Sequence, residues 1–151
     1  MLETKTNTII YLGSDHAGFS VKPDLKEYLK KKGYDVVDLG TFSDEAYDYP
    51  DVAREVGEKV LERAGSFGIL LCGSGIGVSI GANRMKGIRC VNARDLKMVE
   101  MSRLHNDCNV LAMGARDISV SDMKKFIDKF LNTEFLEEER HIRRNKKLDM
   151  I

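Results

Sequence analysis

The chain has 151 residues, of which 42% are hydrophobic, which is enough for one compact domain that buries about two thirds of its unfolded surface. Its 24 Lys and Arg residues balance its 24 Asp and Glu residues, and this net charge of zero argues against a nucleic-acid-binding or membrane-surface protein. No apolar run approaches the roughly 18 residues of a membrane span, and the N-terminus lacks a signal-peptide core. We therefore expect a cytoplasmic protein whose partner is a small molecule.

The cysteines and histidines suggest neither disulfides nor a metal. The three cysteines, Cys72, Cys90 and Cys108, are odd in number and show no CxxC spacing, so we expect free thiols. None of the three histidines stands four residues from another, as a helical metal motif requires. No metal and no cofactor are expected.

Short apolar segments rich in β-branched residues alternate with amphipathic segments along the chain. The expected strands, in chain order, are 9–13, 34–40, 67–73, 88–93 and 109–114. The expected helices between and after them are 22–33, 49–65, 78–87, 95–105 and 121–132, followed by a charged segment at 133–151. We expect a single domain over 1–151, with 1–7 as a flexible tail.

This alternation predicts the fold class. Parallel strands joined by helices need right-handed crossovers, which place helices on both faces of the sheet. We therefore expect a three-layer, Rossmann-like α/β domain with a five-stranded parallel sheet. Pro23 suits the first turn of the first helix, and Gly33 supplies its stop.

In such a sheet, ligands bind at the carboxyl ends of the strands, and there a glycine-rich loop, "CGSGIGVS", follows the third strand. Val78 stands where a dinucleotide fingerprint needs its third glycine, and no GK[ST] follows, so both common phosphate motifs are excluded. The backbone amides of such a loop can instead hold an anion at the start of the next helix. Alternatively, the glycines only let strand and helix pack closely.

Cys72 ends the third apolar run, beside that helix N-terminus, where a thiolate is favoured and can act as a base. The alternative is a small core side chain, which is our interpretation of Cys90. Asp15 and His16 end the first strand at the same edge and are candidates for binding a sugar, or else a helix cap and a surface histidine.

Three arginines are candidates for phosphate binding. Arg116 follows the fifth strand at the ligand edge, while Arg140 and Arg144 are four residues apart and so share one helical face. A solvated helix face is the alternative for the latter two. The segment "RLHNDCN" places His105 and Asn106 at a helix end, where they provide either chemistry or ordinary turn formation.

Taken in order, "GSDHAGF", "DYPDVA", "CGSGIGVSIGANR", "SRLHNDCNVLAMGAR" and "RHIRR" resemble the ribose-5-phosphate isomerase B family, which is related to the galactose-6-phosphate isomerase subunits. The resemblance runs from about Ile9 to Arg144. It implies interconversion of ribose 5-phosphate and ribulose 5-phosphate through an enediolate, a step of the pentose phosphate pathway. It also implies a metal-independent homodimer or dimer of dimers.

The resemblance further implies roles for individual residues. Cys72 would be the base that moves a proton between C1 and C2, and His105 its acid/base partner in ring opening. The substrate-binding set would be Asp15, His16, Tyr49, Gly73, Ser74, Gly75, Ile76, Gly77, Asn106, Arg116, Arg140 and Arg144. A branch with a glutamate after the glycine loop does not fit, because Val78 occupies that position.

Chain direction predicts that the active site is shared. Cys72 ends a strand, whereas His105 ends a helix that runs antiparallel to the strands, so the two belong at opposite edges of the sheet. We expect a neighbouring subunit to bring its His105, and the C-terminal helix to reach across. A noncatalytic flavodoxin-like module and an isomerase of a six-carbon phosphosugar such as allose 6-phosphate remain alternatives.

Overall fold

The computed structural model describes residues 7–151, so the expected tail over 1–7, apart from its last residue, lies outside the described residues. The strands are β1 (Ile9–Ser14), β2 (Asp35–Asp38), β3 (Phe67–Cys72), β4 (Cys90–Asn92) and β5 (Val110–Gly114). The helices are the short 3-10 turn η1 (Phe19–Val21), α1 (Lys22–Lys31), α2 (Tyr49–Glu62), α3 (Ile76–Asn83), α4 (Leu96–Asn106), α5 (Val120–Asn132) and α6 (Glu139–Leu148).

All five strands pair in parallel in the order β2-β1-β3-β5-β4, which confirms the predicted five-stranded parallel sheet. A flavodoxin-like sheet has the order 2-1-3-4-5, so the last two strands are exchanged here. As a result β5 lies directly beside β3, with Gly114 opposite Cys72. The exchange also leaves β4 at the edge of the sheet.

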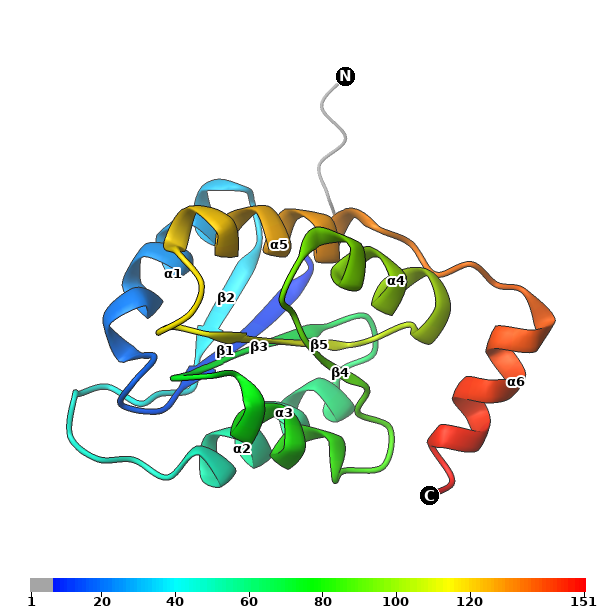
Figure 1. Ribbon diagram of the computed structural model, residues 1–151, viewed down its shortest axis with the longest axis horizontal. Helices are drawn as coiled ribbons and strands as arrows, with labels where there is room; N and C mark the ends of the chain where they lie inside the picture. Colours follow the sequence, from blue (N-terminus) through cyan, green and yellow to red (C-terminus); the bar gives the residue numbers. More distant parts are fainter. Residues whose placement is uncertain (1–6) are drawn as a thin grey trace.

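Helices cover both faces of the sheet, as the three-layer prediction required. Figure 1 shows α1, α4 and α5 on one side and α2 and α3 on the other. The central strand β3 contributes to both hydrophobic cores. Ile69 packs in the core beneath α1, α4 and α5, and Leu70 packs in the core beneath α2 and α3. Strands buried on both faces read as continuous apolar runs, which explains the pattern of the sequence.

Helix α2 approaches the sheet closely at two glycines. A methyl group added to Gly13 or Gly68 would lie 2.8 or 2.7 Å from the Val56 side chain, so neither position has room for one. The two glycines therefore let α2 rest directly on the backbones of β1 and β3. This contact places Tyr49, the first residue of α2, at the carboxyl edge of the sheet.

The helix termini follow local sequence with one difference. Pro23 lies in the first turn of α1, and Gly33, with φ of +91°, follows its end as predicted. The helix expected at 78–87 spans Ile76–Asn83 instead, because Gly75 adopts the left-handed conformation immediately before it. No helix within residues 7–151 is long and apolar enough to cross a membrane.

Helix α6 stands apart from the layers. It lies beyond the end of α4, at the right of Figure 1, after an extended connection from α5. Its two buried residues, His141 and Asn145, are both polar.

Candidate active site

A cavity of about 250 Å³ opens at the carboxyl edge of the sheet. It is lined by Asp15, Tyr49, Cys72, Gly73, Ser74, Gly77, Arg116 and Asp117. The ends of β1, β3 and β5 and the starts of α2 and α3 supply these residues. All but Asp117 belong to the predicted site, and the signal for Asp117 was its position directly after Arg116.

Cys72 lies at the opening of the glycine loop. It is the last residue of β3, only 4% exposed, and its Sγ accepts a hydrogen bond from the Gly75 amide at 3.1 Å. Gly75 has φ of +77°, and an added Cβ would collide with the Asn92 side chain, so only glycine suits this position. The glycine therefore fixes both the bend of the loop and the place of the sulfur.

The loop is organised by its own side chains. Ile76 N–H donates to Ser74 Oγ at 3.2 Å, just as the Gly75 amide donates to the sulfur. Ile76 is also the first residue of α3, so the positive end of that helix faces the same point. An anionic oxygen of a ligand next to the thiol would thus lie at the positive end of α3.

Asp15 and His16 occupy the end of β1. Asp15 is 6% exposed, and its Oδ1 accepts hydrogen bonds from Ala17 N–H at 2.9 Å and Gly18 N–H at 3.1 Å. One carboxylate oxygen therefore caps the turn, as the alternative interpretation held, while the side chain also lines the cavity. His16 is exposed and does not line it; its Nδ1 accepts from Tyr47 N–H at 3.2 Å, which leaves the proton on Nε2.

A buried lysine anchors the segment that orients His16. The Nζ of Lys22 donates to Asp38 Oδ1 at 2.8 Å and to the carbonyl of Thr41. The segment from Thr41 leads to Tyr47 and then to Tyr49. The Tyr49 ring packs on Gly77 so closely that a Cβ added to this glycine would lie 2.8 Å from the ring. Lys22 was missed from the sequence, because a lysine at the start of an amphipathic helix looks like an exposed residue.

The β5–α5 connection brings a cation to the loop. Arg116 N–H donates to the Gly73 carbonyl at 3.0 Å, and its guanidinium lies against the same glycine. Within residues 7–151 no carboxylate pairs with it, so its charge is available to an anion. Arg94, which was not predicted as a site residue, pairs with Asp117 at 3.2 Å and donates to the Ser74 carbonyl at 3.3 Å.

Seven predicted site residues do not line this cavity. His16, Gly75 and Ile76 are next to lining residues in the chain, whereas the other four are not: His105, Asn106, Arg140 and Arg144. Helix α4 ends at Asn106 and feeds the start of β5, whereas the cavity lies beyond the end of β5. The five residues of that strand span at least about 13 Å. Figure 1 shows the same separation, with α6 and the end of α4 on the right and the β5–α5 connection on the left.

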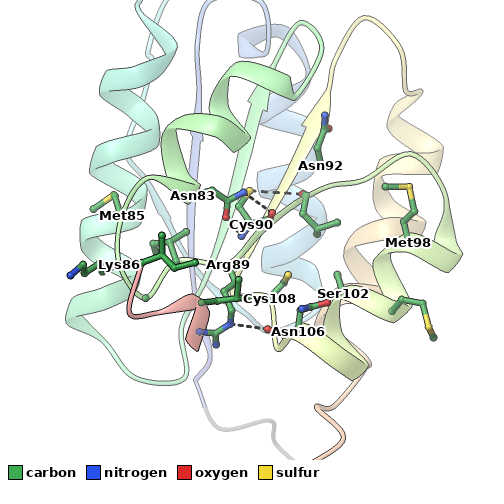
Figure 2. A pocket seen from close by; sticks show the side chains of 16 residues that line it. Asn83, Met85, Lys86, Arg89, Cys90, Asn92, Met98, Ser102, Asn106 and Cys108 are labelled. Carbon is green, nitrogen blue, oxygen red and sulfur yellow. Dashed lines mark hydrogen bonds between the residues drawn. The ribbon is translucent and has the colours of Figure 1, made fainter. Parts of the chain in front are cut away.

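A larger cavity, of about 700 Å³, lies along the free edge of β4 between α3 and α4 (Figure 2). Asn106 lines it, together with Cys90, Cys108 and apolar side chains. The Asn106 carbonyl accepts from Arg89 Nε at 2.7 Å. We take the smaller cavity as the candidate site, because only that one gathers a thiol, a carboxylate, a guanidinium and the glycine loop.

Comparison with known proteins identifies the family. The model of the Ribose/Galactose Isomerase family matches residues 10–148. The chain belongs to this family. Its relatives include ribose-5-phosphate isomerase B of Escherichia coli, 40% identical over 126 residues that cover 83% of this chain and 85% of the relative. The protein of that name from Mycobacterium leprae is 36% identical over 136 residues, 89% of this chain and 84% of the relative.

Solved structures agree with this assignment to the Ribose/Galactose Isomerase family. The ribose 5-phosphate isomerase of Thermotoga maritima has a TM-score of 0.92 and 42% identity, and covers 97% of this chain and 100% of its own. Ribose-5-phosphate isomerase B of Clostridium thermocellum has a TM-score of 0.91 and 40% identity, with 95% and 96% coverage. Among residues 7–151, no three His, Cys, Asp or Glu side chains are grouped to hold a metal ion.

The environments of the thiols predict selective alkylation. Burial raises the pKa of the Cys108 thiol to about 11 and raises the pKa of Cys90 further, so both stay protonated at pH 8. A pKa two units above the ordinary one leaves about 100-fold less thiolate, the reactive form. Iodoacetamide at pH 8, followed by peptide mass spectrometry, should modify Cys72 first, and inorganic phosphate should slow that reaction. Equal rates at Cys90 or Cys108 in the folded protein would contradict this.

Proposed function

We propose that this member of the family is a ribose-5-phosphate isomerase that interconverts ribose 5-phosphate and ribulose 5-phosphate. The observation that carries the proposal is the Cys72 sulfur, hydrogen-bonded at the opening of the glycine loop in one cavity with Asp15 and Arg116. The names of the relatives support the choice of substrate. We also propose one isomerase domain over 1–151, a place in the pentose phosphate pathway, and a cytoplasmic location, which suits three free thiols.

In this proposal Cys72 moves the proton. Its thiolate removes the proton from C2 of the open-chain sugar, the C–H electrons form the C1–C2 double bond, and the aldehyde oxygen becomes the enediolate oxygen. The electrons of the C1–C2 double bond then take a proton from the resulting thiol at C1, the O2 hydroxyl becomes the carbonyl, and the proton of that hydroxyl passes to O1. General base catalysis contributes about 10² to 10⁴ in rate. Each well-aimed backbone donor to the developing oxyanion is worth about 3 kcal/mol.

The remaining residues hold the substrate. Asp15 and the Nε2 of His16 would contact the sugar, and Tyr49 would close one wall of the cavity. The phosphate would lie against Arg116, whose guanidinium has no carboxylate partner among the described residues. A bidentate arginine contact suits a phosphate, which supports this end of the site as the phosphate end.

We further propose that the complete site forms between two subunits of a homodimer or dimer of dimers. The cavity of one chain lacks His105, Asn106, Arg140 and Arg144, which lie at the other edge of its own sheet. The exposed side chains of Ile76 (49%) and Ile80 (57%) on α3 supply apolar surface for such contact. The partner would bring its His105 as the acid/base group and its two arginines for the phosphate.

Two other functions are weaker candidates. A noncatalytic module would explain the glycines and arginines but not a thiol placed at the oxyanion donors, and its flavodoxin-like strand order is absent. A six-carbon phosphosugar such as allose 6-phosphate would undergo the same chemistry in a longer pocket.

Steady-state kinetics with purified protein tests the function. We expect turnover of ribose 5-phosphate to ribulose 5-phosphate without added metal and in the presence of EDTA, with a smaller kcat/KM for allose 6-phosphate. A larger kcat/KM for allose 6-phosphate would transfer the proposal to the six-carbon sugar. Binding of both sugars without turnover of either would favour the noncatalytic module.

Replacement of the thiol separates chemistry from binding. Cys72→Ala should abolish isomerisation and leave the free energy of unfolding and phosphate binding nearly unchanged, because the thiol moves a proton rather than supporting the sheet. NMR of substrate-dependent deuterium exchange at C2 is the direct measurement, and Cys90→Ala is the matched control. Wild-type exchange in Cys72→Ala would remove this residue from the mechanism.

Mixing two inactive variants tests the shared site. Cys72→Ala and His105→Ala proteins, exchanged between oligomers, should regain activity, because each mixed dimer has one site with both residues intact. A site built within one chain would regain none. Native mass spectrometry verifies that subunits have exchanged, so a persistently inactive mixture would refute the shared site.

A further inference from the structure

The ring of His105 is stacked on a second imidazole. His141 of α6 lies parallel to it, with ring centroids 4.4 Å apart and planes inclined by 15°. His141 is 6% exposed, and its buried Nε2 has no hydrogen-bond partner among the described residues. The Glu138 carboxylate lies 3.9 Å from that nitrogen. No role for His141 was predicted from the sequence.

Helix α6 also holds the backbone of His105. Asn145, one turn after His141, is 6% exposed and donates from Nδ2 to the His105 carbonyl at 3.2 Å. That carbonyl is in the last turn of α4, where carbonyls lack intrahelical partners. His105 is thus contacted by α6 at its ring and at its backbone.

The two residues of α6 that are buried, His141 and Asn145, are both polar. Burying polar groups costs free energy that apolar side chains would not, and the buried Nε2 of His141 and Oδ1 of Asn145 make no hydrogen bond within the described residues. If these positions served only to attach the helix to the domain, leucine would do so at a lower cost in free energy. The imidazole therefore calls for an explanation beyond docking.

The surroundings of His141 keep it neutral. Burial lowers its pKa, and the neighbouring His105, Arg140 and Arg144 lower it further. Glu138 acts in the opposite direction, but its Oε2 already accepts a hydrogen bond from Arg140 Nε at 3.1 Å. A neutral imidazole beside His105 leaves its neighbour free to carry a proton without facing a second ring charge.

We infer that His141 is a positioning residue, an aromatic support that holds the His105 ring in place for its acid/base role. The inference rests on the proposed function, in which His105 is the acid/base group. It also gives α6 a second role besides carrying Arg140 and Arg144. Helix α6 and the end of α4 would present His105 and the two arginines to the partner's cavity as one unit.

The pH dependence follows from the direction of the shift. Because the folded protein lowers the pKa of His141 below the ordinary 6.5, the neutral stack contributes stability above that pH. This contribution is lost as the pH falls through the lowered value, when a charged His141 would face His105 and two arginines. Activity should therefore decline at acidic pH as the stacking of His105 and His141 is lost.

Three variants test the role of the ring. His141→Ala should lower kcat by about tenfold or more, since misplacing a catalytic group by about 1 Å can cost about 100-fold, while the affinity for inorganic phosphate stays within about threefold. His141→Phe keeps a ring that cannot take a proton, so it should retain wild-type kcat at pH 8 and lose the acidic decline that the stack causes. Arg143→Ala, an exposed residue of α6 paired with Glu139, is the control.

NMR supplies a readout that does not depend on turnover. The ring signals of the three histidines, assigned by substitution, should show His141 titrating below pH 6.5, and the ring-current shift of His105 should persist in His141→Phe and vanish in His141→Ala. The inference would be overturned by a wild-type kcat in His141→Ala, or by an equal loss of kcat in His141→Ala and His141→Phe. It would also be overturned if His141 titrated at or above pH 6.5. An inactive wild-type protein would overturn the proposed function and the inference together. If the wild-type protein is active and His141→Ala has the same kcat, only the inference is overturned.

Discussion

The parallel pairing of β3 with β5 is the constraint on which the candidate site depends. It places Cys72 opposite Gly114, and a methyl group on Gly114 would lie 2.7 Å from the Ser74 carbonyl, so the two connections meet backbone to backbone. This close approach brings Arg116 against Gly73 and lets the Gly75 amide reach the sulfur. A strand inserted between β3 and β5 would separate the thiol from the guanidinium by one strand spacing, about 4.8 Å.

The two edges of the sheet divide the chemistry. The carboxyl edge holds the thiol, the glycine loop and Arg116, and the amino edge holds His105 with α6. Helix α6 is joined to α4 by the stacked imidazoles and by Asn145, and Arg89 ties its C-terminal end to the domain through Asp149 at 2.8 Å. These polar contacts fix the direction in which the helix presents its arginines. A shared site between subunits is the arrangement in which both edges would act on one substrate.

Much of the fold could be predicted from the chain because its signals are local. Apolar runs with β-branched residues indicate buried strands, Pro23 and Gly33 bound a helix, and the loop at 73–77 indicates a turn rich in backbone donors. The cluster of Asp15, Tyr49, Cys72 and Arg116 was also predictable, since carboxyl ends of parallel strands share one edge. Lys22 and His141 were not, because a charged or aromatic residue in an amphipathic helix carries no sign of being buried against a distant segment. Arg94 was not either, because an exposed arginine between β4 and α4 carries no sign of the carboxylate with which it pairs.

By itself the sequence determined the alternation of strands and helices, the direction of every strand and therefore which residues stand at which edge. Tertiary structure alone decided that β5 lies between β3 and β4, that Lys22 is buried beneath the segment orienting His16, and that His105 meets His141. The physical reason is the range of the interactions. Hydrophobic periodicity and backbone conformation act between near neighbours in the chain, whereas strand order and the stacking of two rings depend on how separate helices pack over the same sheet.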